Sequence, residues 1–455
     1  MNSGPSPIHG RLWTSTTWPF IASVLALMTF IAFESFAITT VLPVAMAELG
    51  GPQWYALAYS STITAALVGM IIGGDWCDRA GPHRPLLMGG ALFLCGLALC
   101  VMAPDAGTFI LGRILQGLGG GIDSVVLYVL IARHIPEAAR PRMFGLLTAA
   151  WIVPSMAGPT IAGALTELTT WRTVFGLILA GATIALACLL RTTRQAPRTA
   201  RVPPQAVFGR RAALSFVAAS LLIVLHLGAQ LDPPRSIPVV LGALVGLGVV
   251  AQKILPAGTL LLQGEPQRLI ALRAVLGATV TTTDLYLTLY LQTERGHPPT
   301  IAGLVISVGA LGWAGGAWLQ GRFSSRHAVH RRLIAFATPL ISAGPATALL
   351  HTAHVLPLWT VIAGCLAMGT GMGIVYPRLS SSTLSLTDAE QHGTYSSALQ
   401  VGEGLTVGAA TALTAVILAS SLASSTSFTL VYAVLLTLSL GAILIAAPGR
   451  LPARG

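Results

Sequence analysis

Charged residues are scarce in this chain of 455 residues. Asp, Glu, Lys and Arg together make up 9% of the sequence, hydrophobic residues make up 54%, and the mean hydropathy is +0.76. A soluble domain carries about 25% charged residues, which it needs to cover a surface that faces water. The composition therefore excludes an ordinary soluble globular domain.

Lysine is almost missing, because Lys253 is the single lysine among 26 Lys and Arg residues. This bias, with abundant alanine, is typical of a GC-rich bacterial genome. The net charge of +11 would suggest a nucleic-acid partner in a soluble protein, but here the arginines fall in loops between apolar runs, so we expect none.

The five cysteines lack metal-ligand spacing, and we expect neither a disulfide framework nor a metal site.

The motifs of membrane-embedded enzymes are also missing. The sequence has no H-E-x-x-H, no G-x-S-x-G and no P-loop, and its histidines lie mostly in loops. We therefore expect a protein that is not an enzyme and that carries no organic cofactor.

Apolar runs recur along the whole chain, each of about 20 residues and so long enough to cross roughly 30 Å of hydrocarbon as a helix. The first run is longer than the apolar region of a signal peptide, and Glu34 interrupts it, so we expect it to be retained. The pattern predicts an all-α polytopic membrane protein with fourteen spans. The expected spans are 20–46, 55–74, 85–103, 107–132, 143–165, 172–190, 212–230, 237–252, 268–292, 300–320, 332–350, 356–377, 394–419 and 428–447.

The spans fall into two sets of six with a pair between them. We expect an N-terminal six-helix bundle in 1–190, an arginine-rich linker with two extra helices in 191–267, and a C-terminal bundle in 268–455. Gly74 and Gly321 each open an arginine-bearing loop after the second span of their set, and such an internal repeat is typical of transporters. Twelve spans are the alternative, with the extra pair lying on the membrane. The arginine-rich loops place both termini in the cytoplasm.

A charged loop follows the second span, in the stretch GDWCDRAGPHRPL. Gly81 would let the backbone turn with a positive φ, and Asp78 at the membrane surface can accept hydrogen bonds from a helix N-terminus. Arg79 and Arg84 could meet Glu137 beyond the fourth span. The alternative role is a positive-inside anchor alone, although an anchor does not require Asp78.

Arg113 lies inside the fourth span, in LGRILQGLGGG. An arginine inside a span costs at least ~2.5 kcal/mol, which makes it a candidate functional residue. Gln116, Gly117 and Gly120 follow at helical spacing on the same face. The glycines would also let another helix approach closely, which is their purely structural interpretation.

Four carboxylic acids lie deep within expected spans. An ionised carboxylate in hydrocarbon is expensive, so such a group can take a proton and can pair with a cationic substrate instead. Glu34 is our first candidate for the proton carrier and Asp123 our second, and we do not expect Asp123 to pair with Arg113, about 15 Å away along the helix. Asp284 and Glu403 are the matching candidates in the second set. The alternative for both is a helix residue that is paired or faces water and plays no part in coupling.

These motifs, in this order, resemble those of the major facilitator superfamily, and specifically of its fourteen-span drug:proton antiporters. The loop that starts at Gly74 resembles G-x-L-A-D-R-x-G-R-K-x-x-L, and the stretch around Arg113 resembles R-x-x-Q-G-x-G. The stretch ESFAITTVLP resembles the first-span pattern D-x-T-I-V-N-V-A-L-P, with Glu34 at the aspartate position.

A fourth stretch, PSMAGPTIAG in the fifth span, resembles the antiporter motif g-x-x-x-G-P-x-x-G-G. Gly158 and Pro159 match it and Gly163 ends it, whereas Pro154 and Ala162 depart from its glycines. Proline removes a backbone hydrogen bond and kinks a helix, and neighbouring glycines let another helix close against it. By resemblance, this motif favours export over uptake.

The resemblance implies a major facilitator fold, in which two six-helix bundles and two inserted helices work by alternating access. The charged loop would act as a conformational latch against the helix that starts near Thr394 in the other half. We expect a proton-coupled antiporter that exports lipophilic, often cationic, small molecules, with protons as the coupling ion. The alternatives are an exporter of an endogenous lipid, siderophore or metabolite and, third, a nutrient symporter. Its partners would be the small-molecule substrate and the lipid bilayer, and we expect a monomer in the bacterial cytoplasmic (inner) membrane.

Overall fold

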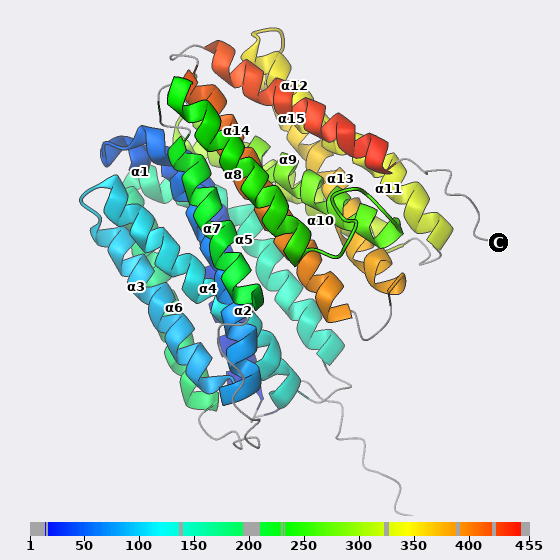
Figure 1. Ribbon diagram of the computed structural model, residues 1–455. Helices are drawn as coiled ribbons and strands as arrows, with labels where there is room; N and C mark the ends of the chain where they lie inside the picture. Colours follow the sequence, from blue (N-terminus) through cyan, green and yellow to red (C-terminus); the bar gives the residue numbers. More distant parts are fainter. Residues whose placement is uncertain are drawn as a thin grey trace, which may run out of the picture. The chain divides into compact units, whose positions relative to one another are not determined.

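The chain is helical throughout the part that the computed structural model describes, apart from short connections (Figure 1). The helices of the first half are α1 (Trp18–Glu48), α2 (Tyr55–Ala80), α3 (His83–Met102), α4 (Ala106–His134), α5 (Arg140–Leu168), α6 (Trp171–Thr193) and, after a gap, α7 (Arg210–Gly228) and α8 (Pro233–Ile254). The helices that follow are α9 (Glu265–Thr293), α10 (Pro299–Gln320), α11 (His327–Ile341), α12 (Ala343–Thr352), α13 (Leu358–Ser385), α14 (His392–Ser420) and α15 (Ser425–Ala446). The described residues are 14, 17–135, 140–193, 210–228, 231, 233–322, 327–387, 392–420 and 425–446.

Every expected span coincides with helical residues, with one interruption. The expected span 332–350 is divided at Ser342 into α11 and α12. Pro339 lies one turn before the division, and a proline inside a helix removes a backbone hydrogen bond. The helices therefore agree with the sequence pattern, and the break is the departure that the apolar run alone did not predict.

Eleven of the described helices are long and apolar enough to cross a membrane, with α11 and α12 counted together. Helices α5, α7 and α9 fall outside this set. The apolar part of α7 is shorter, Ala213–Gly228, and α9 carries Arg268, Arg273 and Asp284 among threonines. Fourteen spans thus stay a prediction, whereas an all-helical chain with many apolar helices is observed.

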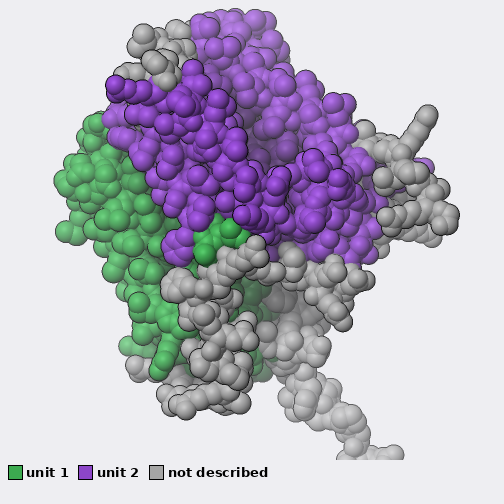
Figure 2. All heavy atoms as spheres, viewed as in Figure 1, with its two compact units in different colours: residues 1–51, 61–215 green, residues 52–60, 216–455 purple. Residues whose placement is uncertain are grey.

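The described helices group into two compact units, coloured separately in Figure 2. The first unit consists of residues 1–51 and 61–215, and the second of residues 52–60 and 216–455. Residues 216–228 of α7 belong to the second unit, where His226 Nε2 lies 2.9 Å from the Ser60 hydroxyl at the start of α2. The three-part division expected from the sequence stays a prediction.

Glycine seams let the helices within each unit pack backbone to backbone. In the first unit, a Cβ on Gly117 of α4 would lie 2.2 Å from the Thr62 carbonyl oxygen of α2, and one on Gly96 of α3 would lie 2.5 Å from the Gly112 carbonyl oxygen of α4. Only glycine fits such approaches. The seams fix α4 against α2 and α3, and so fix the position of the Arg113 side chain.

Candidate functional site

The first unit contains a buried ion pair between Glu34 of α1 and Arg113 of α4. The guanidinium donates through Nη1 to Glu34 Oε1 and also to Gln116 Oε1, 3.1 Å away. The thiol of Cys100 on α3 donates to the same Gln116 oxygen at 3.4 Å. Glu34 is 3% exposed and Arg113 2% exposed, so the pair is sealed from solvent within its unit. Two charges in such surroundings persist because each neutralises the other.

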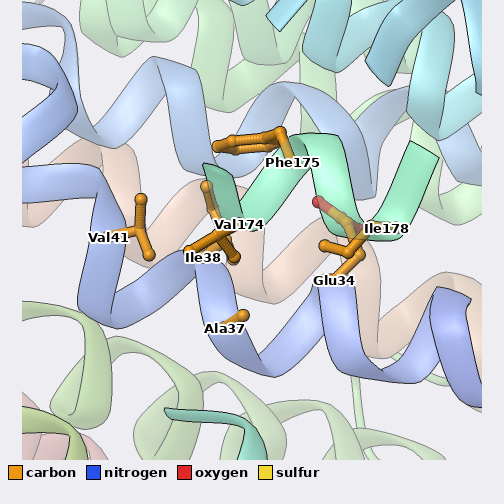
Figure 3. A pocket seen from close by; sticks show the side chains of 7 residues that line it. All are labelled: Glu34, Ala37, Ile38, Val41, Val174, Phe175 and Ile178. Carbon is orange, nitrogen blue, oxygen red and sulfur yellow. The ribbon is translucent and has the colours of Figure 1, made fainter. Parts of the chain in front are cut away.

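A narrow apolar hollow adjoins this pair, between α1 and α6 (Figure 3). Glu34 lies at the end of the hollow near Ile178, and its carboxyl group is the acid among otherwise apolar side chains. The lining residues are Glu34, Ala37, Ile38, Val41, Val174, Phe175 and Ile178. The hollow therefore combines hydrophobic walls with one acidic side chain.

The expected antiporter motif packs against the helix that carries Glu34. A Cβ on Gly158 of α5 would lie 3.6 Å from the Phe33 ring and 3.7 Å from Phe36 Cβ, both on α1. Pro154 and Pro159 lie inside α5, and Pro154, Pro159 and Gly163 are buried. The motif thus borders the buried pair from the side of α5.

Asp123 lies further along α4, without a charged partner of its own. It is fully buried, and within the described part of the chain neither carboxyl oxygen has a hydrogen-bond partner. Gly89 of α3 faces it, because a Cβ there would lie 2.5 Å from Asp123 Oδ1. Arg113 pairs with Glu34 instead, in agreement with the expectation that Asp123 and Arg113 do not meet.

The second unit contains a different cluster, built around Arg273 of α9. Arg273 Nε donates to Glu403 Oε2 of α14 at 3.0 Å, Nη1 donates to the Ser380 hydroxyl at 2.6 Å, and Nη2 donates to the Tyr376 hydroxyl of α13. The Tyr376 hydroxyl in turn donates to Glu403 Oε2 at 2.9 Å. Gly277, one turn after Arg273, makes room for the acid, since a Cβ there would lie 2.5 Å from Glu403 Oε1.

Asp284 of α9 lies apart from that cluster, among aromatic side chains. It interacts electrostatically with Tyr59, Cys365 and Tyr432, all three of which are buried in the second unit. The Asp284 side chain itself is partly exposed. It therefore lies near buried tyrosines and a thiol, and among the described residues it belongs to none of the observed ion pairs.

The charged loop between α2 and α3 has the backbone expected of it. Gly81 has a φ of +73°, which confirms the predicted left-handed turn, and the Arg133 guanidinium lies next to it, 3.7 Å from where a Cβ would be. The Arg84 side chain is exposed. Glu137 and the side chains of Asp78, Arg79 and Thr394 lie outside what the structure describes, so the latch contacts stay predictions.

The family model of the Major Facilitator Superfamily matches residues 24–411, which is most of the chain. The chain belongs to this superfamily. Two bacterial relatives carry the names of drug-efflux or drug-resistance proteins. A "Probable multidrug-efflux transporter" of Mycobacterium tuberculosis is 26% identical over 81% of this chain and 81% of its own length. "Multidrug resistance protein 3" of Bacillus subtilis is 23% identical over 80% of this chain and 72% of its own length.

Solved structures agree on the fold. A POT family transporter in complex with 5-aminolevulinic acid superposes with a TM-score of 0.70 at 13% identity, covering 94% of this chain and 96% of that one. A peptide transporter POT in complex with sulfate gives a TM-score of 0.68 at 16% identity, covering 94% of each chain. This chain is therefore a multi-pass membrane transporter of small molecules and not an enzyme.

Three residues of the second cluster escaped the sequence analysis. Arg273 lies inside an expected span, and the criterion that selected Arg113 would have selected it too. Tyr376 and Ser380 carry no such signal, because a tyrosine and a serine are ordinary in a transmembrane helix. Of the residues around Arg113, Gln116 was selected by its spacing, and Gly117 proved to face α2 rather than the ion pair.

Proposed function

We propose that this transporter is a fourteen-span, proton-coupled antiporter that exports lipophilic, often cationic, small molecules by alternating access. The buried Glu34–Arg113 pair carries the proposal, because it places a titratable acid at an apolar hollow and opposite a fixed positive charge. The efflux names of the bacterial relatives support the direction of transport.

The pair supplies a simple rule for exchange. While Glu34 is ionised, it neutralises Arg113. When alternating access opens the hollow, the carboxylate can pair with a cation instead. When Glu34 takes a proton, the site carries the uncompensated charge of Arg113, which repels a cation across surroundings of low polarity. Proton and cationic cargo therefore exclude each other, and this exclusion is what an antiporter requires.

The membrane potential adds to the proton gradient as a driving force. Each elementary charge that crosses the membrane contributes ~2.3 kcal/mol per 100 mV. Entry of more than one proton per exported monovalent cation would use this term as well as the pH difference. In this scheme the other three acids within the expected spans, Asp123, Asp284 and Glu403, are the candidates for an additional proton.

The test is transport by the full chain in proteoliposomes with an imposed pH gradient, using ethidium as the cation. We expect proton-driven ethidium movement by the wild-type protein and a fall to background in Glu34→Gln. Glu294→Gln is the matched control, because it makes the same substitution at an exposed position, and we expect it to transport normally. Normal proton-coupled transport by Glu34→Gln would refute the assignment of Glu34.

Export of an endogenous metabolite is the second candidate function, and one fungal relative, named as the transporter of a biosynthesis cluster, favours it. An "MFS efflux transporter" of Aspergillus oryzae is 30% identical over 63% of this chain and 55% of its own length, and the transporter of an acurin A biosynthesis cluster of Aspergillus aculeatus is 26% identical over 77% of this chain. The same assay separates the two functions, since a metabolite exporter would move no ethidium in either direction.

A further inference from the structure

The guanidinium of Arg273 lies between an acid and an aromatic ring. Its central carbon lies 3.9 Å from the centre of the Tyr376 ring, and its Nε bonds Glu403. The Trp313 ring of α10 packs beside Tyr376, with 5.4 Å between the ring centres. A carboxylate next to aromatic faces is the arrangement that recognises organic cations. Here the chain's own cation fills it.

The acid is the more accessible member of this ion pair. The Glu403 side chain is 21% exposed, against 9% for Arg273. Trp313 and Tyr376 are also partly exposed. A molecule that reaches the cluster therefore meets the carboxylate and the rings before it meets the guanidinium, which favours a cationic ligand over an anionic one.

The geometry also allows the guanidinium to give way. Arg273 Nη1 donates to the Ser380 hydroxyl at 2.6 Å, and this bond does not involve the acid. A guanidinium that leaves Glu403 and the Tyr376 ring therefore keeps an acceptor one helical turn away, on the same helix as Tyr376.

We propose that Glu403, Tyr376 and Trp313 form a binding site for organic cations within the second unit, and that Arg273 is its built-in competitor. An arriving lipophilic cation replaces the guanidinium on the Tyr376 ring and beside Glu403. The inference rests on the proposed function for the class of substrate only, because the site would bind cations whether or not protons drive their export.

Direct binding of tetraphenylphosphonium to the detergent-solubilised full chain, at fixed pH and without a gradient, tests the site. Arg273→Met removes the competitor, and we expect it to bind the probe about tenfold more tightly than the wild-type protein. Arg273→Lys keeps the charge and should stay within about twofold of wild type. Adding Glu403→Gln to Arg273→Met should abolish the gain.

Arg322→Met is the matched control for the loss of an arginine from an aromatic ring. Arg322 lies 3.6 Å from the centre of the Trp318 ring at an exposed position, so its removal should leave probe affinity unchanged. Equal affinity in Arg273→Met and wild type would overturn the proposal, and so would a gain that survives Glu403→Gln.

Tyr376 provides a second pair of variants in case Arg273→Met does not fold. Tyr376→Phe keeps the ring and should bind the probe within about threefold of wild type, whereas Tyr376→Leu should lose about tenfold. Equal loss in both variants would overturn the role of the ring.

Proton-driven efflux of the same probe from proteoliposomes separates this inference from the proposed function. The expected binding pattern without proton-driven efflux would refute the antiporter and leave the site intact. Proton-driven efflux with a probe affinity that none of the substitutions changes would refute the site and leave the antiporter intact.

Discussion

The two units each bury an arginine–glutamate pair, but they build it differently. In the first unit, Glu34 and Arg113 are both at most 3% exposed, and an amide, Gln116, is their neighbour. In the second unit, Tyr376 bridges Arg273 and Glu403, and the acid is 21% exposed. The same two charges are thus sealed in one unit and reachable in the other.

This difference separates two tasks that one site performs poorly. A sealed acid with a fixed countercharge is suited to coupling, because it can exchange a proton only when a change of conformation gives it access to water. A reachable acid beside aromatic rings is suited to binding a cation that arrives from outside. Under the two proposals, the first cluster serves proton coupling and the second adds recognition of cations.

Removing the arginine of the sealed pair should give the largest effect on stability. Arg113→Gln leaves Glu34 as an unpaired buried charge, and breaking a buried pair in this way costs about 3–5 kcal/mol. We expect a markedly lower melting temperature of the purified protein in detergent, and reduced yield.

The double variant Glu34→Gln/Arg113→Gln is its control, since it removes both charges and leaves two amides that can bond each other. It should recover much of the lost stability. A single variant as stable as the double would show that the pair is not sealed, and the contrast between the units would disappear.

A methyl group at Gly277 should disturb the reachable pair by a smaller amount. The Cβ of Gly277→Ala would lie 2.5 Å from Glu403 Oε1, so the carboxylate must shift away from Arg273. Such overpacking costs about 1–3 kcal/mol. We expect a lower melting temperature for this variant. We also expect tetraphenylphosphonium to raise that temperature by less than it does in the wild-type protein.

The control for Gly277→Ala is Gly315→Ala on α10, where an added Cβ meets nothing within 4 Å. It should leave both the melting temperature and the effect of the probe unchanged. If Gly277→Ala behaved in the same way, the Glu403 carboxylate would make room for a methyl group more easily than the 2.5 Å approach implies.

The sequence predicted the helices well because twenty-residue apolar runs have few other structures available in a membrane. It also selected Glu34 and Arg113, each from its own motif. The sequence did not predict that they pair, because the two residues are 79 positions apart. They meet only through the rotation of α1 and α4 about their axes. Gly112 and Gly117 set that rotation for α4, by contacts that a spacing pattern does not encode.

The second cluster was harder to predict for the same reason. Glu403 and Arg273 are 130 positions apart, and Gly277 acquires its role only when α14 lies against it. Arg273 was within reach, because a charged residue inside an apolar run is a signal by itself. The break in the expected span 332–350 had a signal too, in Pro339.

An exposed acid outside the spans gives the smallest effect and completes the comparison. Asp105 caps α4, accepting hydrogen bonds from the Thr108 backbone N–H at 2.9 Å and from the Thr108 hydroxyl at 3.0 Å. These bonds hold the pKa of the Asp105 carboxyl below its ordinary value of 3.8. Because the folded-state pKa is lowered, the stabilisation is present above pH 3.8 and is lost as the pH falls through the folded value.

Melting temperatures of the wild-type protein and Asp105→Asn, measured between neutral pH and pH 3, test this titration. The asparagine keeps an acceptor oxygen without the titratable charge, so the small advantage of the wild type should be constant near neutral pH and shrink below pH 3.8. An advantage that stayed constant down to pH 3 would mean that the capping bonds do not depend on the charge of Asp105.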